Sequence, residues 1–165
     1  MKIFKEIISY ILIIAFVVGI RTYLITPARV NGASMETTLF DGDILLLEKF
    51  NKKYQRFDIV VFNYDNSSLV KRIIALPGEH VKYLDDKLYI NNELVVEDYI
   101  NEQTGNFDLT SINYEVIPDG YYFVMGDNRD NSVDSRLIGL IAEKDILGKT
   151  NFRIFPFNKI GSLDY

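Results

Sequence analysis

The chain contains no cysteine and only one histidine among its 165 residues. The lack of cysteine excludes disulfide bonds, thiol catalysis and cysteine-ligated metals. The single histidine, His80, follows Pro77-Gly78-Glu79 in a predicted turn, where no neighbour in sequence would orient its ring. We therefore predict that His80 is a surface residue. A serine hydrolase built on this chain would need a different general base.

Basic residues are also few. The chain has 18 Lys and Arg against 23 Asp and Glu, a net charge of −5 and a pI of about 4.9, with no Lys/Arg-rich run. This balance argues against a phosphate-binding surface, so we predict no nucleic-acid partner. Repeats, linkers and low-complexity tracts are absent from the sequence, and residues 27–165 are predicted to form one domain.

The N-terminal segment differs from the rest of the chain. Residues 7–20 carry no charge, and Lys2, Lys5 and Arg21 flank them. A helix from about Ile3 to Ile25 would be long enough to cross a bilayer, which takes roughly 20 residues. We predict that residues 1–26 are a membrane anchor containing this single transmembrane helix.

A cleavable signal peptide is the alternative interpretation of this segment, because the uncharged part alone is short. A weak small-residue cleavage site lies near Val30 and Gly32. The positive charges before the span, together with the α-amino group, favour a cytoplasmic N-terminus and a translocated C-terminal part.

After residue 26 the sequence is typical of short strands separated by turns. Apolar runs occur at residues 44–47, 57–62, 69–76 and 121–125, and Gly or Pro-Gly turn signals lie between them. Asn91-Asn92 separates two short apolar runs, as in a hairpin, because asparagine tolerates the left-handed turn conformation. The pattern predicts a mostly-β domain, folded as an antiparallel barrel or sandwich.

Two separate segments offer a nucleophile and a base. Ser34 lies in NGASMETTL after the small residues Gly32 and Ala33, and Lys71 lies in the apolar run LVKRIIAL. A serine hydroxyl needs a base within hydrogen-bond reach. A lysine buried among apolar side chains has a lowered pKa, so it can accept a proton near neutral pH. Taken alone, Ser34 could be a turn serine and Lys71 an edge-strand lysine that blocks aggregation.

The loop GDNRDNSVDSR, from Gly126 to Arg136, carries an unusual density of charges of both signs. Such density indicates internal ion pairs and side-chain-to-backbone bonds that fix the loop in one shape. A calcium loop is the competing interpretation, but the terminal bidentate glutamate is missing and two arginines intervene. We predict no metal site.

Together, the apolar N-terminal segment, Ser34-Met35, Lys71-Arg72 and the ungapped GDNRDNSVDSR motif resemble a bacterial type I signal peptidase. The resemblance is to the short form common in Gram-positive bacteria and covers nearly the whole chain. It implies a single-pass membrane protein with its catalytic domain on the extracytoplasmic face. It also implies a serine endopeptidase that removes signal peptides after a small-x-small motif, typically Ala-x-Ala.

The resemblance assigns roles to individual residues. Ser34 would be the nucleophile, Lys71 its general base, and Ser132 would orient the lysine through a hydrogen bond. The backbone N–H of Ser34 would form the oxyanion hole, and Gly32 stands where some relatives carry an assisting serine. Four residues would brace the site through ion pairs: Arg72, Asp127, Asp134 and Arg136. Six positions fall where relatives line shallow substrate pockets: Val30, Gly32, Met35, Leu39, Leu69 and Val70.

One departure from the family pattern concerns the turn after the nucleophile. Relatives commonly read Ser-Met-x-Pro-Thr, and this chain has Thr37 at the proline position. Loss of proline frees φ, which predicts a less rigid turn. A lysine rather than a histidine at position 71 favours the bacterial type over that of the endoplasmic reticulum.

The resemblance implies no metal or cofactor, signal peptides and membrane lipid as partners, and a monomer. Two other functions stay open on the sequence. A different Ser–Lys protease that cuts itself or one dedicated partner would use the same chemistry. A membrane-anchored β-domain for binding would carry a serine that no acylating inhibitor labels.

Overall fold

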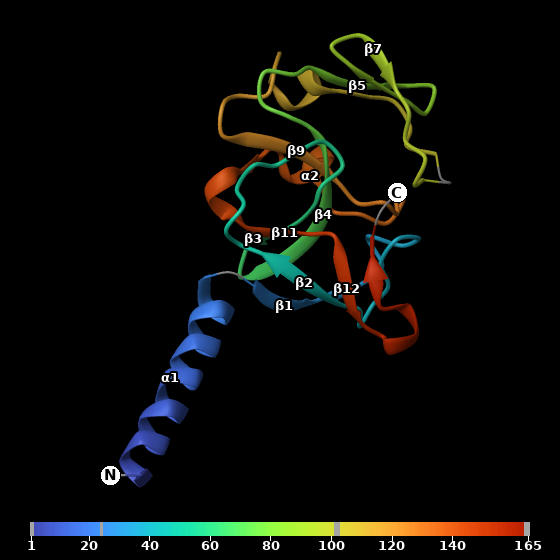
Figure 1. Ribbon diagram of the computed structural model, residues 1–165. Coiled ribbons are helices and arrows are strands. Elements are labelled where there is room, and N and C mark those ends of the chain that lie inside the picture. Colours follow the sequence, from blue (N-terminus) through green and yellow to red (C-terminus); the bar gives the residue numbers. More distant parts are fainter. Residues whose placement is uncertain (1, 24, 101–102, 164–165) are drawn as a thin grey trace.

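The computed structural model describes residues 2–23, 25–100 and 103–163. Over these residues the chain forms helix α1 (Lys2–Tyr23) and thirteen strands in two antiparallel sheets. Figure 1 shows α1 projecting from one end of the β domain, beside β1, β2 and β12, whereas β5 and β7 lie at the opposite end. The prediction of a mostly-β antiparallel domain is confirmed.

The larger sheet contains nine strands, with β1 (Ile25–Arg29) paired to β2 off the main path. In spatial order the others are β10 (Ile141–Ala142), β9 (Tyr121–Met125), β4 (Ser67–Ala75), β3 (Ile59–Tyr64), β11 (Ile146–Thr150), β2 (Ile44–Glu48), β12 (Phe152–Phe155) and β13 (Gly161–Ser162).

The smaller sheet has four strands, in the order β7 (Glu93–Val95), β6 (Lys87–Ile90), β5 (Val81–Leu84) and β8 (Phe107–Asp108). Four short helices connect strands: η1 (Leu109–Ile112), α2 (Ser135–Ile138), η2 (Glu143–Asp145) and η3 (Phe157–Lys159). The predicted hairpin is β6–β7, and Asn91 and Asn92 have φ angles of 52° and 69°. Asparagine adopts this left-handed conformation more readily than most residues.

The described strands of the larger sheet form an open path from β10 to β13. Of the two forms predicted, a barrel or a sandwich, the closed barrel is therefore wrong. Alternation and turn signals determine which neighbouring strands pair, but they carry no information on whether the first and last strands meet.

The N-terminal prediction is only partly met. Residues 2–23 are helical, and the large apolar side chains between Ile3 and Val18 are 42–73% exposed. Within the described part of the chain, however, no helix meets the length and hydrophobicity that a membrane crossing requires. Leu24, inside the predicted span, lies outside the described residues, as do the last two residues of the predicted domain.

Strand β4 lies at the centre of the fold. It pairs with β3 from Ser67 to Arg72 and with β9 from Arg72 to Ala75, and every side chain from Val70 to Ala75 is buried. One apolar cluster joins the two sheets, and it includes Ile74 from β4, Tyr83 from β5 and Phe123 from β9. A second cluster packs the segment after β1 against the larger sheet through Met35 and Leu39. These clusters hold the middle of β4 in a low-dielectric interior.

Gly148 in β11 tests the packing of the larger sheet. A Cβ atom there would overlap the carbonyl oxygen of Glu48 and lie 3.0 Å from Cγ of Leu47. Gly148→Ala should lower the free energy of unfolding by about 1–3 kcal/mol, because backbone cannot move aside cheaply. Urea unfolding measures the loss. Leu147→Ala, on the same strand and 38% exposed, is the control and should cost less than about 1 kcal/mol. Equal losses of unfolding free energy in the two variants would contradict the close packing of Gly148 against Glu48 and Leu47.

Candidate active site

Ser34 lies in a turn that follows β1 and is anchored in the core. Three backbone hydrogen bonds close the turn, from Glu36 N to Ala33 O and from Thr38 N and Leu39 N to Met35 O. Met35 and Leu39 are 1% and 0% exposed, so both ends of the turn are fixed by packing. These three bonds do not involve the position of Thr37, and the lower rigidity expected from the loss of proline there stays a prediction.

Gly32 shapes the approach to the nucleophile. Its φ is +86°, a conformation that favours glycine, and its N–H donates to Oδ1 of Asp41 over 2.8 Å. A Cβ atom at this position would meet nothing within 4 Å. The backbone before Ser34 is therefore open to a second chain.

Lys71 meets Ser34 across the fold. Its side chain is carried by β4 and is only 2% exposed, and Nζ lies 2.5 Å from Oγ of Ser34. The alternative of an edge-strand lysine is wrong, because an aggregation-blocking lysine projects into solvent. The structure thus brings together the two residues that the sequence proposed as nucleophile and base.

The surroundings of Lys71 favour its neutral form. Burial lowers the pKa of Lys71 from its ordinary 10.5 to about 8, against the opposing influence of the carboxylates of Asp134 and Asp127. An ammonium group loses hydration inside protein, and these carboxylates restore only part of that loss. A substantial fraction of Lys71 is then unprotonated just above neutral pH.

Arg72, the next residue on β4, forms the most buried ion pair of the site. Its Nε and Nη2 donate to Oδ1 and Oδ2 of Asp127 over 2.9 and 2.6 Å, and the two side chains are 0% and 1% exposed. Nη1 donates to the carbonyl oxygen of Phe57. This bidentate geometry fixes the start of the loop 126–136 against β4.

Asp134 organises the end of the same loop. Its fully buried carboxylate accepts hydrogen bonds from Nε and Nη2 of Arg136, both over 2.9 Å, and from the N–H of Gly126 over 3.1 Å. Asp134 also caps helix α2 by accepting from the Arg136 N–H. The loop is therefore closed on itself by the kinds of bonds that its charge pattern predicted.

The loop also contacts the nucleophile segment directly. The N–H of Asn128 donates to the carbonyl oxygen of Ser34, and its Nδ2 donates to that of Ala33, each over 3.1 Å. A Cβ atom on Gly126 would overlap Oγ of Ser132 and the carbonyl oxygen of Ser34. Only glycine permits this close approach, so the shape of the loop determines where Ser34 lies.

Ser132 does not have the partner expected for it. Its Oγ is buried and makes no hydrogen bond with any described residue, so the predicted bond to Lys71 is not formed in this structure. The family resemblance predicts a role for Ser132, but it does not predict the conformation of its side chain. Buried hydroxyl groups without partners are rare, which marks Ser132 as a group with an unused hydrogen-bonding capacity.

A cleft of about 440 Å³ opens over Ser34 and Lys71. Of the six predicted pocket residues, Gly32 and Leu69 line it. The other four are buried in the core instead, where they pack together or against the larger sheet: Val30, Met35, Leu39 and Val70. Strand alternation explains part of this difference, since Val70 and Leu69 point to opposite faces of β4. The substrate-binding role of the six residues stays a prediction.

Sequence reasoning missed most of the residues that do line the cleft. The remaining lining comes from the nucleophile segment and from the loop and its continuation: Asn31, Ala33, Asp130, Asn131, Ser132, Val133 and Leu137. Val133 and Leu137 are 53% and 74% exposed. An apolar residue inside a charged loop was the signal that could have identified Val133.

A second buried ion pair was also missed. Nη2 of Arg129 lies 2.5 Å from Oε1 of Glu97, with side chains 0% and 4% exposed, and Nη1 donates to Thr104 and Tyr83. Glu97 lies in an irregular segment that no sequence pattern connects with the loop. Its contacts depend on tertiary structure alone.

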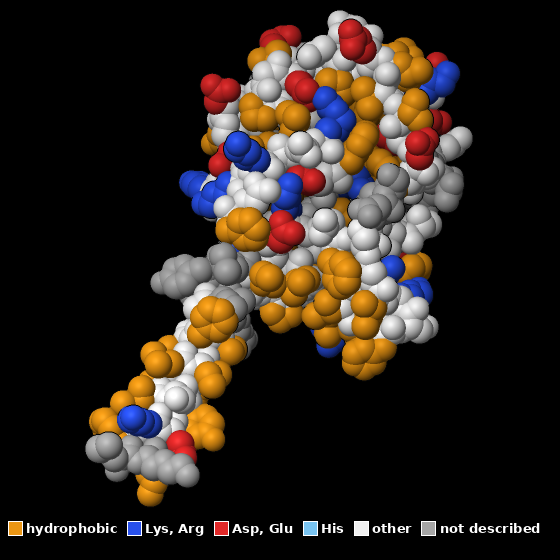
Figure 2. Space-filling view, in the orientation of Figure 1, with side chains coloured by type: hydrophobic (Ala, Val, Ile, Leu, Met, Phe, Trp, Pro, Cys, Tyr) orange, Lys and Arg blue, Asp and Glu red, His pale blue; other side chains and the backbone are white. Residues whose placement is uncertain are grey.

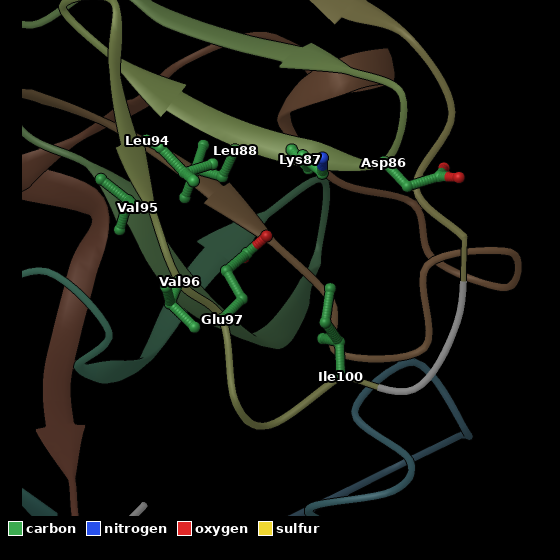
Figure 3. A pocket seen from close by; sticks show the side chains of 8 residues that line it. All are labelled: Asp86, Lys87, Leu88, Leu94, Val95, Val96, Glu97 and Ile100. Carbon is green, nitrogen blue, oxygen red and sulfur yellow. The ribbon is translucent and has the colours of Figure 1, made fainter.

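The other candidate sites have fewer features of a catalytic or ligand-binding site. His80 Nδ1 lies 2.7 Å from the carbonyl oxygen of Glu115, and its other contacts are with residues of the smaller sheet. Within the ranges that the structure describes, no three His, Cys, Asp or Glu side chains gather as metal ligands would. A second cleft of about 370 Å³ lies beside β6 and β7, where Figure 3 shows Leu94, Val95 and Val96 around it.

Comparison with known proteins agrees with this geometry. The pattern of the family "Signal peptidase, peptidase S26" matches residues 3–155. The chain belongs to the signal peptidase family, peptidase S26. It is therefore a peptidase, and the resemblance to the Gram-positive type I signal peptidases is confirmed. The alternative of a binding domain without catalysis is wrong.

Several signal peptidases are similar over nearly the whole chain. Signal peptidase I of Bacillus licheniformis is 37% identical, covering 99% of this chain and 94% of that protein. Signal peptidase IB of Staphylococcus aureus (strain COL) is 38% identical, covering 94% and 93%. A crystal structure of a signal peptidase I from Enterococcus faecalis V583 is 40% identical, with a TM-score of 0.56 over 59% of this chain and 96% of that one.

The buried pair of Arg72 and Asp127 gives a stability prediction for this signal peptidase. Asp127→Asn leaves the Arg72 guanidinium buried without its counter-charge, and should lower the free energy of unfolding by about 3–5 kcal/mol. Asp108→Asn, on a carboxylate that is 35% exposed, is the control and should cost about 1 kcal/mol or less. Chemical denaturation of both variants measures the difference. Similar losses would show that the Arg72 pair is not desolvated.

Proposed function

We propose that this chain is an endopeptidase that removes signal peptides from translocated preproteins, with Ser34 as nucleophile and Lys71 as general base. The contact of 2.5 Å between Lys71 Nζ and Ser34 Oγ, made by a buried lysine at the floor of an open cleft, carries the proposal. The names of the relatives support the choice of substrate. Their small-x-small cleavage motif stays a prediction from the family resemblance.

The proposed reaction begins with proton transfer from Oγ of Ser34 to neutral Nζ of Lys71. Oγ attacks the carbonyl carbon of the scissile peptide, and Lys71 returns the proton to the leaving amine as the acyl-enzyme forms. Lys71 then takes a proton from a water molecule, whose oxygen attacks the ester. Lys71 gives this proton to Oγ of Ser34 as the ester C–O bond breaks, which restores the serine hydroxyl and the neutral lysine and releases the signal peptide. Each step needs one group that cycles between base and acid near neutral pH.

The N–H of Ser34 is the proposed donor to the oxyanion of the tetrahedral intermediate. Within the described residues this N–H donates no hydrogen bond, so it is available to a substrate. The hydrogen bonds of Asn128 to the carbonyl oxygens of Ala33 and Ser34 support a fixed orientation of this peptide group. A preoriented donor stabilises developing charge without reorganisation.

Ser132 is the proposed orienting group for Lys71 during the reaction. Its buried hydroxyl lines the same cleft and has no hydrogen-bond partner among the residues that the structure describes. Once Ser34 is acylated, Lys71 loses its contact with the serine hydroxyl and needs another. The presence of this hydroxyl in the cleft that Lys71 also lines supports such an exchange of partners.

The substrate is proposed to bind as an added strand along β4. From Ser67 to Lys71 this strand pairs only with β3 among the described residues, because β9 pairs from Arg72 onward. An unpaired strand edge recognises extended peptides through backbone hydrogen bonds. Leu69 and Gly32 line the cleft beside this edge and would contact the substrate side chains.

Attachment to membrane lipid through α1 and the adjoining surface is part of the proposal. Figure 2 shows hydrophobic side chains on α1 and on the domain face beside it. Four of the exposed apolar residues are Phe40, Phe155, Phe157 and Ile160. The rings of Phe155 and Phe157 are in contact, and Lys159, which precedes Ile160, lies over the ring of Phe40. A single membrane crossing, a cytoplasmic N-terminus, an extracytoplasmic catalytic domain and a monomeric state stay predictions.

Loss of either partner of the catalytic pair should abolish cleavage without unfolding the protein. Ser34→Ala and Lys71→Met are expected to cut a detergent-presented preprotein at least about 10³-fold more slowly than wild type. Lys71→Met should raise the free energy of unfolding at pH 7 by about 1–3 kcal/mol, because it removes a buried charge.

Cleavage assays and thermal unfolding of the two variants measure these effects. The product N-terminus, read by mass spectrometry, identifies the bond that is cut. Activity retained by either variant would refute the assignment of the pair. A wild type that trims only its own chain would instead favour a dedicated Ser–Lys protease.

The pH dependence of cleavage follows from the lowered pKa of Lys71. Because the neutral lysine is the base, kcat/KM should rise with pH through a midpoint of about 8 and then level off. At pH 7 the rate should be about a tenth of the plateau. Initial rates at low substrate between pH 6 and 9.5, at constant ionic strength, test this, and a flat profile across that range would contradict it.

A further inference from the structure

Arg129 joins the loop 126–136 to three other parts of the chain. Nη1 donates to Oγ1 of Thr104 over 2.8 Å and to the hydroxyl of Tyr83 over 3.1 Å, and Nη2 meets the carboxylate of Glu97. The hydroxyls of Tyr83 and Tyr99 donate to the same Glu97 oxygen over 3.0 and 2.6 Å. Burial raises the pKa of both tyrosines, so they remain neutral donors.

The segment from Glu97 to Tyr99 contacts two arginines: Arg129, within the loop 126–136, and Arg72, on β4, which pairs with Asp127 of that loop. Glu97 pairs with Arg129, and the guanidinium of Arg72 lies 4.0 Å from the centre of the Tyr99 ring. Figure 3 shows Glu97 among the residues of the second cleft, between the β6–β7 hairpin and Ile100. One short segment thus supports the loop at two points from outside the active-site cleft.

Arg129 also determines the local shape of the loop. Its Nε donates to the carbonyl oxygen of Gly126 over 3.1 Å, and its own carbonyl oxygen accepts from Nη2 of Arg136 over 2.8 Å. Asn128 lies between these two anchor points and holds the carbonyl oxygens of Ala33 and Ser34. A continuous series of contacts therefore runs from Glu97 through Arg129 and Asn128 to the nucleophile.

We propose that Glu97 is a positioning residue for catalysis, which acts through Arg129 to keep Asn128 and the Ser34 peptide group in the reactive arrangement. This inference rests on the proposed function. A buried ion pair is a poor device for stability alone, since apolar residues of similar volume are often as stable. The directed hydrogen bonds of Arg129, however, fix the loop geometry in a way that apolar packing does not.

Glu97→Gln tests the proposal, and Glu79→Gln is its matched control. Glu79 also pairs with an arginine, Arg56, over 2.7 Å, but the two side chains are 18% and 22% exposed and neither has a described contact with the loop. Glu97→Gln should lower kcat about tenfold at a temperature where both variants are folded, since small displacements of reacting groups are costly. KM should stay within about twofold, and the pH midpoint should not move, because Glu97 makes no contact with Lys71.

Amide hydrogen exchange gives a second measurement that does not depend on cleavage. The N–H of Asn128 should exchange faster in Glu97→Gln and at the wild-type rate in Glu79→Gln, because only the first change loosens the loop. Tyr83→Phe removes one acceptor of Arg129 and keeps the ring. In Tyr83→Phe the N–H of Asn128 should also exchange faster than in wild type, but by less than in Glu97→Gln. This variant replaces Glu97→Gln in the test if Glu97→Gln does not fold.

The outcomes separate the two hypotheses. A wild type that does not cut a preprotein would refute the proposed function. The rate of amide hydrogen exchange at Asn128 in the variants would still show whether Glu97 positions the loop. An active wild type with unchanged kcat and unchanged Asn128 exchange in the folded variants would overturn the inference. A lowered melting temperature in Glu97→Gln, with kcat per folded molecule unchanged, would also overturn it, since that is the result of a purely structural pair.

Discussion

Lys71 enters the protein interior on β4 and ends 2.5 Å from Oγ of Ser34. Burial lowers the pKa of this lysine to about 8, and the nearby carboxylates of Asp134 and Asp127 moderate that effect. A lysine in water is almost fully protonated at neutral pH and cannot act as a base. Because the only histidine, His80, lies just before β5 and away from Ser34, the chemistry proposed for Ser34 depends on this desolvation.

The structure around Lys71 maintains that environment, and it does so with several other charged side chains that are themselves buried. Arg72, the residue after Lys71 on β4, pairs with Asp127, and the carboxylate of Asp134 accepts hydrogen bonds from Arg136 and from the N–H of Gly126. These partners limit how far the two carboxylates can stabilise a charged Lys71. The same bonds shape the loop that carries Asn128 to the nucleophile segment. The same residues therefore determine both the charge environment of Lys71 and the shape of the loop beside Ser34.

Sequence alone predicted the parts of this protein that local pattern determines. The β6–β7 hairpin follows from Asn91-Asn92, and the identity of Ser34 and Lys71 as a candidate pair follows from their residue types and from the family motifs. Sheet closure and the cleft lining did not follow, because they depend on which elements pack together. Glu97 shows the limit most clearly, since its partner Arg129 is distant in sequence and no periodicity links them.

The central claim is that burial lowers the pKa of Lys71 enough for its neutral form to act as the base, and the titration of Lys71 tests this most directly. NMR of the protein with isotopically labelled lysine side chains, with Lys71→Met to assign the signal, would follow the ionisation of Nζ between pH 6 and 11. The account predicts a midpoint of about 8. A midpoint near the ordinary 10.5 would contradict it, because Lys71 would then be charged throughout the range in which the enzyme is proposed to act.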